Sequence, residues 1–209
     1  MPLDSLTLRA LALELDRALR DVKIDKIHMP RPREAVLATR PGRLLLGPNG
    51  VYFTALKDEN PDTPPMLCML LRKHLSGARL TNISQIPMER CAMFTFDCID
   101  EMGDQVQKKL IAELMGKTCN IYLLSPDGRI IDCLRRIGLD AGTKRTALPG
   151  MYYQEPAAVN KQDPRALEEE DYVNLLSKPG ADLLSDRLMD ALGGLSPLIC
   201  REAALFAAV

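Results

Sequence analysis

The chain has 209 residues, of which 46% are apolar and 26% charged, a composition typical of folded globular proteins. This length allows one or two domains with a sizeable core, and no apolar run approaches the roughly 18 residues that a membrane-spanning helix requires. The formal net charge of −1 argues against indiscriminate binding of nucleic acids.

The first part of the chain predicts a helix followed by a hairpin. Apolar residues recur at helical spacing over 6–19, and Asp4 or Ser5 can cap the first turn of such a helix. Strand-like runs follow at 35–39, 44–46 and 51–55. Gly50, which ends a Pro-Asn-Gly sequence between the last two runs, provides the positive φ of a tight turn, so we expect these two strands to pair.

The middle of the chain predicts two helices among further strands. A proline-rich linker precedes a helix over 66–76, which Gly77 ends. Asp104 and Gln107 can form a capping box for a second helix, over 104–115. β-branched and aromatic residues, with a Pro-Asp-Gly turn between the last two runs, predict strands at 79–86, 90–99, 120–124 and 129–133.

A domain boundary is expected near residue 161. The segment before it is rich in Pro and Tyr and has few regular signals, whereas the pattern beyond it is helical throughout. We therefore divide the chain into a mixed domain, 1–161, and a helical region, 162–209. Runs of strands interrupted by only a few helices predict the α+β class.

The cysteines and the N-terminus bear on the compartment. The six cysteines include no CxxC pair, and we expect them to be reduced core residues. With only His28 and His74 besides, the spacing favours no metal site, and no cofactor is expected. Asp4 and Arg9 interrupt the apolar stretch that a signal peptide would need, so we expect a cytoplasmic protein.

Basic residues concentrate near the start of the chain. Residues 1–57 hold 10 basic and 6 acidic side chains, whereas residues 162–209 hold 4 and 9. Arg31 and Arg33 belong to this basic stretch, and Arg72 and Lys73 lie at the exposed end of the predicted helix over 66–76. These four are candidate phosphate contacts, although a solvated basic surface accounts for the pattern equally well.

Two short motifs could also contact nucleic acid. Arg90 can donate a pair of hydrogen bonds to a phosphate or a guanine edge, and Glu89 can accept from a base amine, although such neighbours commonly form a surface ion pair. In the helical region, the glycine-bearing connection at Gly194 could present backbone amides to a phosphate. An ordinary helical connection explains that sequence equally well.

Several enzyme classes lack their motifs in this sequence. No GxxxxGK[ST], GxGxxG, GxSxG or HExxH string occurs, and neither histidine has a nucleophile placed beside it by a motif. Pro2 could in principle supply a secondary amine, as in bifunctional DNA glycosylases, but the chain has no cysteine-pair zinc finger to grip DNA. We therefore expect no enzymatic activity and keep a glycosylase as an alternative.

Five separated strings resemble one family in order and spacing. They are PPMLCMLLRKHLSGARLTNISQ, the Glu89-Arg90 pair, ELMGKTCNIYLL, ALPGMYY and GGLSPLICREA. Together they are similar to the N-terminal NFACT domain of bacterial ribosome-quality-control factors, often named fibronectin-binding proteins. The resemblance implies a β-sandwich akin to that of formamidopyrimidine DNA glycosylases, with flanking helices and without their chemistry. It also implies that 162–209 begins a helix-hairpin-helix region that continues in full-length members.

The same resemblance implies a function. Family members bind tRNA, notably alanyl-tRNA in bacteria, on a large ribosomal subunit blocked by a stalled chain, and they support template-independent C-terminal tailing. The family's early Asp matches Asp4, and its Asp-Arg pair matches Glu89 and Arg90, so the resemblance implies tRNA binding by these three residues. Glu89 keeps the charge of the family's Asp but extends the carboxylate by one methylene. A fibronectin-binding adhesin, which the alternative family name implies, is the second hypothesis.

Overall fold

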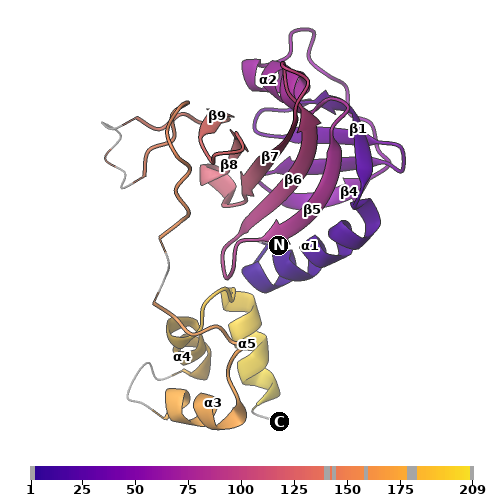
Figure 1. Ribbon diagram of the computed structural model, residues 1–209. Helices are drawn as coiled ribbons and strands as arrows, with labels where there is room; N and C mark the ends of the chain where they lie inside the picture. Colours follow the sequence, from indigo (N-terminus) through magenta and orange to yellow (C-terminus); the bar gives the residue numbers. More distant parts are fainter. Residues whose placement is uncertain (1–2, 139–141, 143–144, 158–159, 178–182, 208–209) are drawn as a thin grey trace.

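A nine-stranded antiparallel sheet with flanking helices organises the protein (Figure 1). The computed structural model describes every residue except 1–2, 139–141, 143–144, 158–159, 178–182 and 208–209. The antiparallel sheet and its flanking helices confirm the predicted α+β class. The helices and short 3-10 turn are α1 (Ser5–Leu19), α2 (Met66–Leu75), η1 (Gly116–Thr118), α3 (Glu169–Leu176), α4 (Leu184–Ala191) and α5 (Pro197–Phe206).

The strands follow one another in the order β4-β3-β2-β1-β5-β6-β7-β8-β9. Their bounds are β1 (Val22–His28), β2 (Ala35–Thr39), β3 (Arg43–Gly47), β4 (Gly50–Thr54), β5 (Arg79–Gln85), β6 (Cys91–Ile99), β7 (Gln105–Glu113), β8 (Asn120–Leu124) and β9 (Ile130–Cys133). The predicted hairpin between β3 and β4 is confirmed, and Gly50 has the expected positive φ, at 130°.

Strand β1 joins the two halves of the sheet. Its first residues, Val22 and Lys23, pair with β5, whereas Ile24 and the residues after it pair with β2. The pairing with β2 shifts register between Ile24 and Lys26, and such a bulge increases the local twist and bend of a strand. The sequence predicted no strand here, because the charged residues between the apolar ones dilute the signal.

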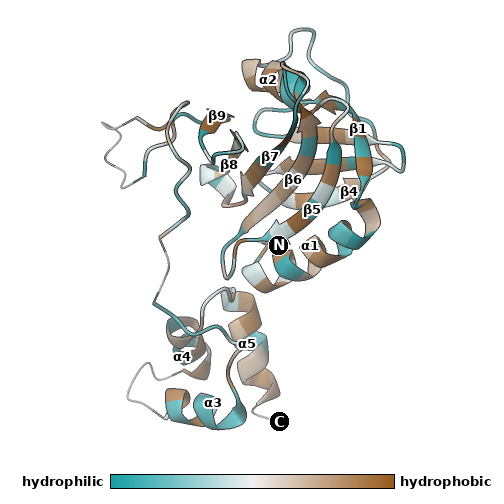
Figure 2. Cartoon of the chain, in the orientation of Figure 1, coloured by the Kyte–Doolittle hydropathy of each residue, from teal (hydrophilic) through white to brown (hydrophobic). Residues whose placement is uncertain are grey.

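One core unites both halves of the sheet with α1 and α2. Apolar side chains of β2 and β3, of β5 to β8 and of both helices form a single buried cluster, in which Phe94 of β6 is fully buried. Figure 2 shows the apolar residues that run along β6. Helix α1 packs against β5 and α2 against β1. This packing fixes the start of α1 relative to the end of β5.

The helix predicted over 104–115 is wrong, because this segment forms strand β7. Its apolar spacing fits a helix, but exposure alternates from Gln105 to Leu110, as in a strand. Pairing with β6 on one side and β8 on the other satisfies the backbone and overrides the local helical pattern. Asp104 caps no helix; its N–H donates to the Asp100 carboxylate at 2.9 Å within a turn.

The helices after residue 161 have a small core of their own, around Leu188, Leu192 and Cys200. The helical pattern predicted there is confirmed, with α4 and α5 packed against each other. The domain boundary itself stays a prediction. All six cysteines are free and buried, as expected, and among the described residues no helix has the length and apolar character to cross a bilayer.

Candidate functional site

Three segments that are far apart in sequence enclose one cavity. They are the start of α1, the turn between β5 and β6, and the connection between α4 and α5, which lie close together in Figure 1. The cavity has a volume of about 340 Å³, within the range of small-ligand sites. Its lining includes the predicted residues Asp4, Glu89, Arg90 and Gly194.

Asp4 links two helix starts. Of the two expected caps, Asp4 is the N-cap of α1: its Oδ1 accepts a hydrogen bond from the Thr7 N–H at 2.7 Å, and its Oδ2 accepts from the Ser196 hydroxyl at 3.1 Å. Ser196 is in turn the N-cap of α5, where its oxygen accepts from the Ile199 N–H at 3.3 Å. Asp4 is only 6% exposed. Its geometry is therefore that of a residue that positions both helices at the cavity.

The turn that carries Glu89 and Arg90 is held against α1. Met88 has a φ of 61°, and the Glu89 N–H closes the turn on the Ile86 carbonyl at 3.0 Å. The Gln85 amide donates to the Ser5 carbonyl at 2.6 Å and to the Glu89 carbonyl at 2.8 Å. These bonds hold the Glu89 backbone beside the start of α1, although the two segments are far apart in sequence.

Glu89 and Arg90 differ in the surroundings of their charged groups. Burial raises the pKa of the half-buried Glu89 carboxyl, while the neighbouring Arg90 opposes that shift. Within the described chain, the Arg90 side chain makes no hydrogen bond and no ion pair within 4 Å. Its guanidinium therefore keeps its donors available at the cavity. This arrangement can bind a phosphate or a base edge.

Gly194 brings the helical region against α1. Its carbonyl accepts from the Ser5 N–H at 3.1 Å, and its φ is 76°. A Cβ at this position would lie 3.1 Å from the Cβ of Ser5. Among the described residues, the amide N–H groups of Gly194 and Leu195 have no hydrogen-bond partner, and both residues line the cavity.

Substitution of Gly194 by alanine should loosen this contact. The left-handed backbone costs an alanine about 1–2 kcal/mol, and the Cβ crowds Ser5 in addition. We expect faster amide hydrogen exchange at Ser5, whose N–H is bonded to Gly194. Gly103→Ala is the matched control, because Gly103 has a φ of 90° but nothing within 4 Å of its Cβ position. Equal exchange at Ser5 in both variants would contradict this role of Gly194.

The four other predicted phosphate contacts lie outside this cavity. Arg31 pairs with Glu34 and Asp58 at 3.2 and 2.8 Å. The remaining three are separately engaged: the Arg33 guanidinium donates to the Lys117 carbonyl at 3.2 Å, Arg72 Nε donates to the Ile27 carbonyl at 2.8 Å, and Lys73 Nζ lies 2.6 Å from Glu101 Oε1. The basic stretch therefore does not converge on Glu89 and Arg90.

A buried carboxylate next to the turn was missed by sequence reasoning. Glu113, 3% exposed, pairs with Cys91 across β6 and β7. Its Oε1 lies 2.6 Å from an Arg145 nitrogen and accepts from the Tyr153 hydroxyl at 2.9 Å. Burial, and then this carboxylate, raises the pKa of Tyr153. The available signal in the sequence was a glutamate at the end of an apolar run. Because this segment was predicted to be a helix, the residues that strand pairing brings next to Glu113 were not foreseen.

Burial also governs the thiol beside this cluster. The fully buried Cys91 has a pKa raised to about 12, first by desolvation and then by the charges of Glu113 and Glu89. It is therefore protonated at neutral pH and inert as a nucleophile. In the part of the chain that the structure describes, no three His, Cys, Asp or Glu side chains are placed to hold a metal ion.

Comparison with known proteins extends over almost the whole chain. The family described as NFACT N-terminal and middle domains matches residues 4–209. The Rqc2 homolog RqcH of Bacillus subtilis is 34% identical over 212 residues, which cover 97% of this chain and 37% of that protein. The chain thus spans little more than a third of this curated relative.

Two solved structures share the fold. The N-terminal domain of fibronectin-binding protein PavA from Streptococcus pneumoniae has a TM-score of 0.89 and 29% identity, covering 98% of this chain and 79% of that one. The N-terminal part of the fibronectin/fibrinogen-binding protein from Streptococcus suis has a TM-score of 0.87 and 32% identity, covering 96% and 78%.

Proposed function

This chain belongs to the family of NFACT N-terminal and middle domains, and from that membership we propose that it is the tRNA-binding part of a ribosome-quality-control factor. The relation to the Rqc2 homolog RqcH supports a role in this process. The proposal assigns no catalytic residue to the chain. Peptidyl transfer belongs to the ribosome, and the protein acts as an adaptor.

The observation that carries the proposal is that an available Arg90 guanidinium and the Glu89 carboxylate line the same cavity without forming an ion pair. Arg90 presents hydrogen-bond donors and Glu89 presents acceptors, so together they can contact a phosphate and a base edge. Asp4 supports them indirectly, since its carboxylate joins the starts of α1 and α5. The amides of Gly194 and Leu195 add donors for a phosphate.

The wider role follows from the family resemblance. We propose that the protein acts in the cytoplasm, on a large ribosomal subunit that retains a stalled peptidyl-tRNA. There it would hold alanyl-tRNA and support C-terminal alanine tailing of the stalled chain. The two halves of the sheet around a shared core also support the proposed kinship with the glycosylase β-sandwich.

Substitution of Arg90 by alanine tests this function. We expect the affinity for an alanine tRNA to fall at least about tenfold, equivalent to roughly 1.4 kcal/mol, because a charged hydrogen-bond donor is lost. Thermal unfolding should not change, since Arg90 makes no ion pair within the described chain. Fluorescence anisotropy with labelled tRNA over a salt series, with a non-cognate tRNA as competitor, measures the effect.

Arg17→Ala is the matched control, because it removes the same charge from an exposed position on α1, away from the cavity. It should change the affinity less than twofold. A folded Arg90→Ala variant that binds tRNA as tightly as the Arg17→Ala control would contradict the assignment of Arg90.

The names of the structural neighbours favour a second candidate function, binding of fibronectin, for which the protein would have to reach the cell surface. Detection of the protein on intact cells, together with fibronectin binding there, would support it over the ribosomal role. The third alternative, a DNA glycosylase, depends on Pro2, which lies outside the described residues. Borohydride trapping of a covalent complex with damaged DNA would be required to support it.

A further inference from the structure

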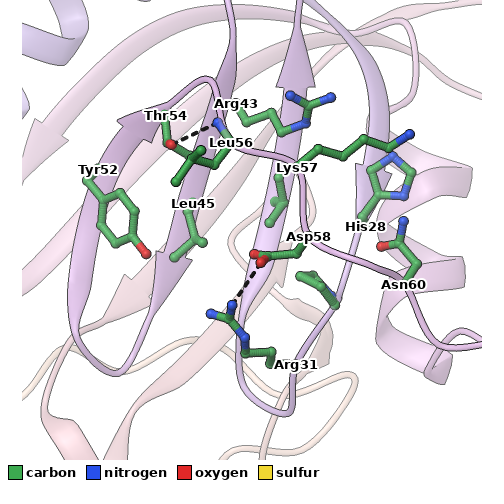
Figure 3. Close-up of a pocket in the computed structure, with 12 residues that line it drawn as sticks. His28, Arg31, Arg43, Leu45, Tyr52, Thr54, Leu56, Lys57, Asp58 and Asn60 are labelled. Carbon is green, nitrogen blue, oxygen red and sulfur yellow. Dashed lines mark hydrogen bonds and ion pairs between the residues drawn. The ribbon is translucent and has the colours of Figure 1, made fainter.

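A second polar pocket lies on the face of β1–β4 that points away from the main core. His28, Val36, Leu45 and Tyr52 are in register across these four strands. Arg43, two residues before Leu45, pairs with Thr54, two residues after Tyr52. Because alternate residues of a strand share a face, Tyr52 and Arg43 lie on the same side of the sheet. Figure 3 shows the segment around Lys57 crossing over this face and closing the pocket.

The pocket is small. Its volume is about 130 Å³, which is below the roughly 300 Å³ at which sites for whole small molecules begin. It therefore suits one compact group, with the remainder of the ligand outside. Tyr52, 41% exposed, offers a ring at its edge for a planar group to stack on.

The charges in the pocket favour an anion. Arg43 donates to the Ala55 carbonyl at 3.0 Å, and within the described chain neither Arg43 nor Lys57 has a carboxylate within 4 Å. The one carboxylate in the lining, Asp58, is paired with Arg31 at 2.8 Å. Figure 3 shows the Arg43 guanidinium, the Lys57 amine and the His28 ring at one end of the pocket. Two uncompensated cations thus face the same space.

The state of His28 agrees with this concentration of positive charge. Burial and then the nearby cations Arg72, Lys26, Arg43 and Lys57 lower the pKa of His28. The ring is therefore neutral at pH 7, and it can donate one N–H without adding a further charge. The same cations would stabilise a bound anion.

We propose that this pocket, bounded by His28, Arg43, Lys57 and Tyr52, binds a phosphate of an RNA strand and that the adjoining base stacks on Tyr52. Cations that track the backbone beside an aromatic platform are the common design of single-strand binding surfaces. The inference rests on the proposed function only for the choice of RNA. The pocket shares no lining residue with the cavity around Arg90, so it is a second, separate site.

The two histidines of the chain give a direct test of location. The chain, labelled with ¹³C-histidine, is titrated with a single-stranded RNA of 12 nucleotides, and the imidazole signals are followed by NMR. We expect His28 to shift and His74 to stay unchanged, because His74 Nδ1 lies 3.1 Å from Lys108 Nζ, outside the pocket. Absence of a shift at His28 overturns the proposal.

Paired variants test the contacts. Arg43→Gln/Lys57→Gln removes both cations that contact the one phosphate in the pocket, so it should reduce the slope of log affinity against log salt by about 0.7, the value for one neutralised phosphate on a single strand. Arg17→Gln/Lys109→Gln, an equal loss of exposed charge elsewhere, should leave the His28 shift intact. Tyr52→Ala should weaken binding at least about fivefold and Tyr52→Phe less than twofold, since phenylalanine keeps the stacking face.

The source of the phosphate and the independence of the site are also tested. Inorganic phosphate or uridine monophosphate that shifts the His28 signal as effectively as the RNA, at equal concentration, would identify a small-anion site and overturn the assignment to RNA.

The Arg90→Ala variant tests whether the two sites are independent, and the His28 shift should persist in it. If Arg90→Ala keeps full tRNA affinity while His28 still shifts, the proposed function fails and the second site stands. Loss of the shift in Arg90→Ala overturns the separate site.

Discussion

Glu113→Ala should lower the free energy of unfolding by about 3 kcal/mol. Removal of one partner from a buried ion pair costs about 3–5 kcal/mol, because the remaining charge loses its oppositely charged neighbour in a medium of low dielectric. The Glu113 side chain is 4% exposed, but that of Arg145 is 27% exposed, and water around Arg145 places the cost at the lower end. The Tyr153 hydroxyl also loses its acceptor. Chemical denaturation measures the change.

The ion pair between Lys73 and Glu101 provides a matched control. Its nitrogen and oxygen are also 2.6 Å apart, but the side chains are 57% and 75% exposed. Exposed pairs of this kind contribute little, since solvent screens them and ordering the long side chains costs entropy. Glu101→Ala should therefore leave the free energy of unfolding unchanged within error. An equal loss in both variants would refute the view that burial makes the Glu113 pair important.

Glu113 also supports the candidate site. Glu113 lies opposite Cys91, directly after Arg90, and the Leu114 N–H donates to the Arg90 carbonyl at 2.8 Å. The negative charge of Glu113 contributes to the raised pKa of Glu89. Glu113 therefore lies next to the turn that carries Glu89 and Arg90 and supports it, but it does not line the cavity.

Phe94→Ala should lower the free energy of unfolding by about 3–5 kcal/mol. Phe94 is fully buried on β6 and belongs to the cluster that both halves of the sheet and both flanking helices share. The lost ring leaves a cavity that the surrounding strands cannot close. For a chain of this size the melting temperature should fall by about 6–20 °C, which calorimetry measures.

Phe53 of β4 is the control for this truncation. It is 38% exposed and lies outside the buried cluster, so much of its ring is already in contact with water. Phe53→Ala should cost well below half of the Phe94 value, because less apolar area is lost from the interior. Similar melting temperatures for the two variants would show that the shared core does not hold the sheet together.

The amino-acid sequence determined the features that depend on near neighbours. The Pro-Asn-Gly turn fixed the β3–β4 hairpin, and Gly77, with a φ of 78°, follows α2 as expected. The sequence left Asp4 and Ser5 as the two candidate caps of the first helix, and the hydrogen bond from Thr7 shows that Asp4 is the cap. Such features follow from local backbone geometry and short-range hydrogen bonds, which a few adjacent residues specify.

The tertiary structure alone decided the identity of β7 and the composition of the sites. The segment Gln105–Glu113 has the apolar spacing of a helix, and only β6 and β8 on either side make it a strand. Asp4 meets Ser196 across 192 residues, and Arg145 reaches Glu113 across 32. Strand pairing and burial between distant segments contribute more free energy than local propensity, and a single sequence does not show which distant segments meet.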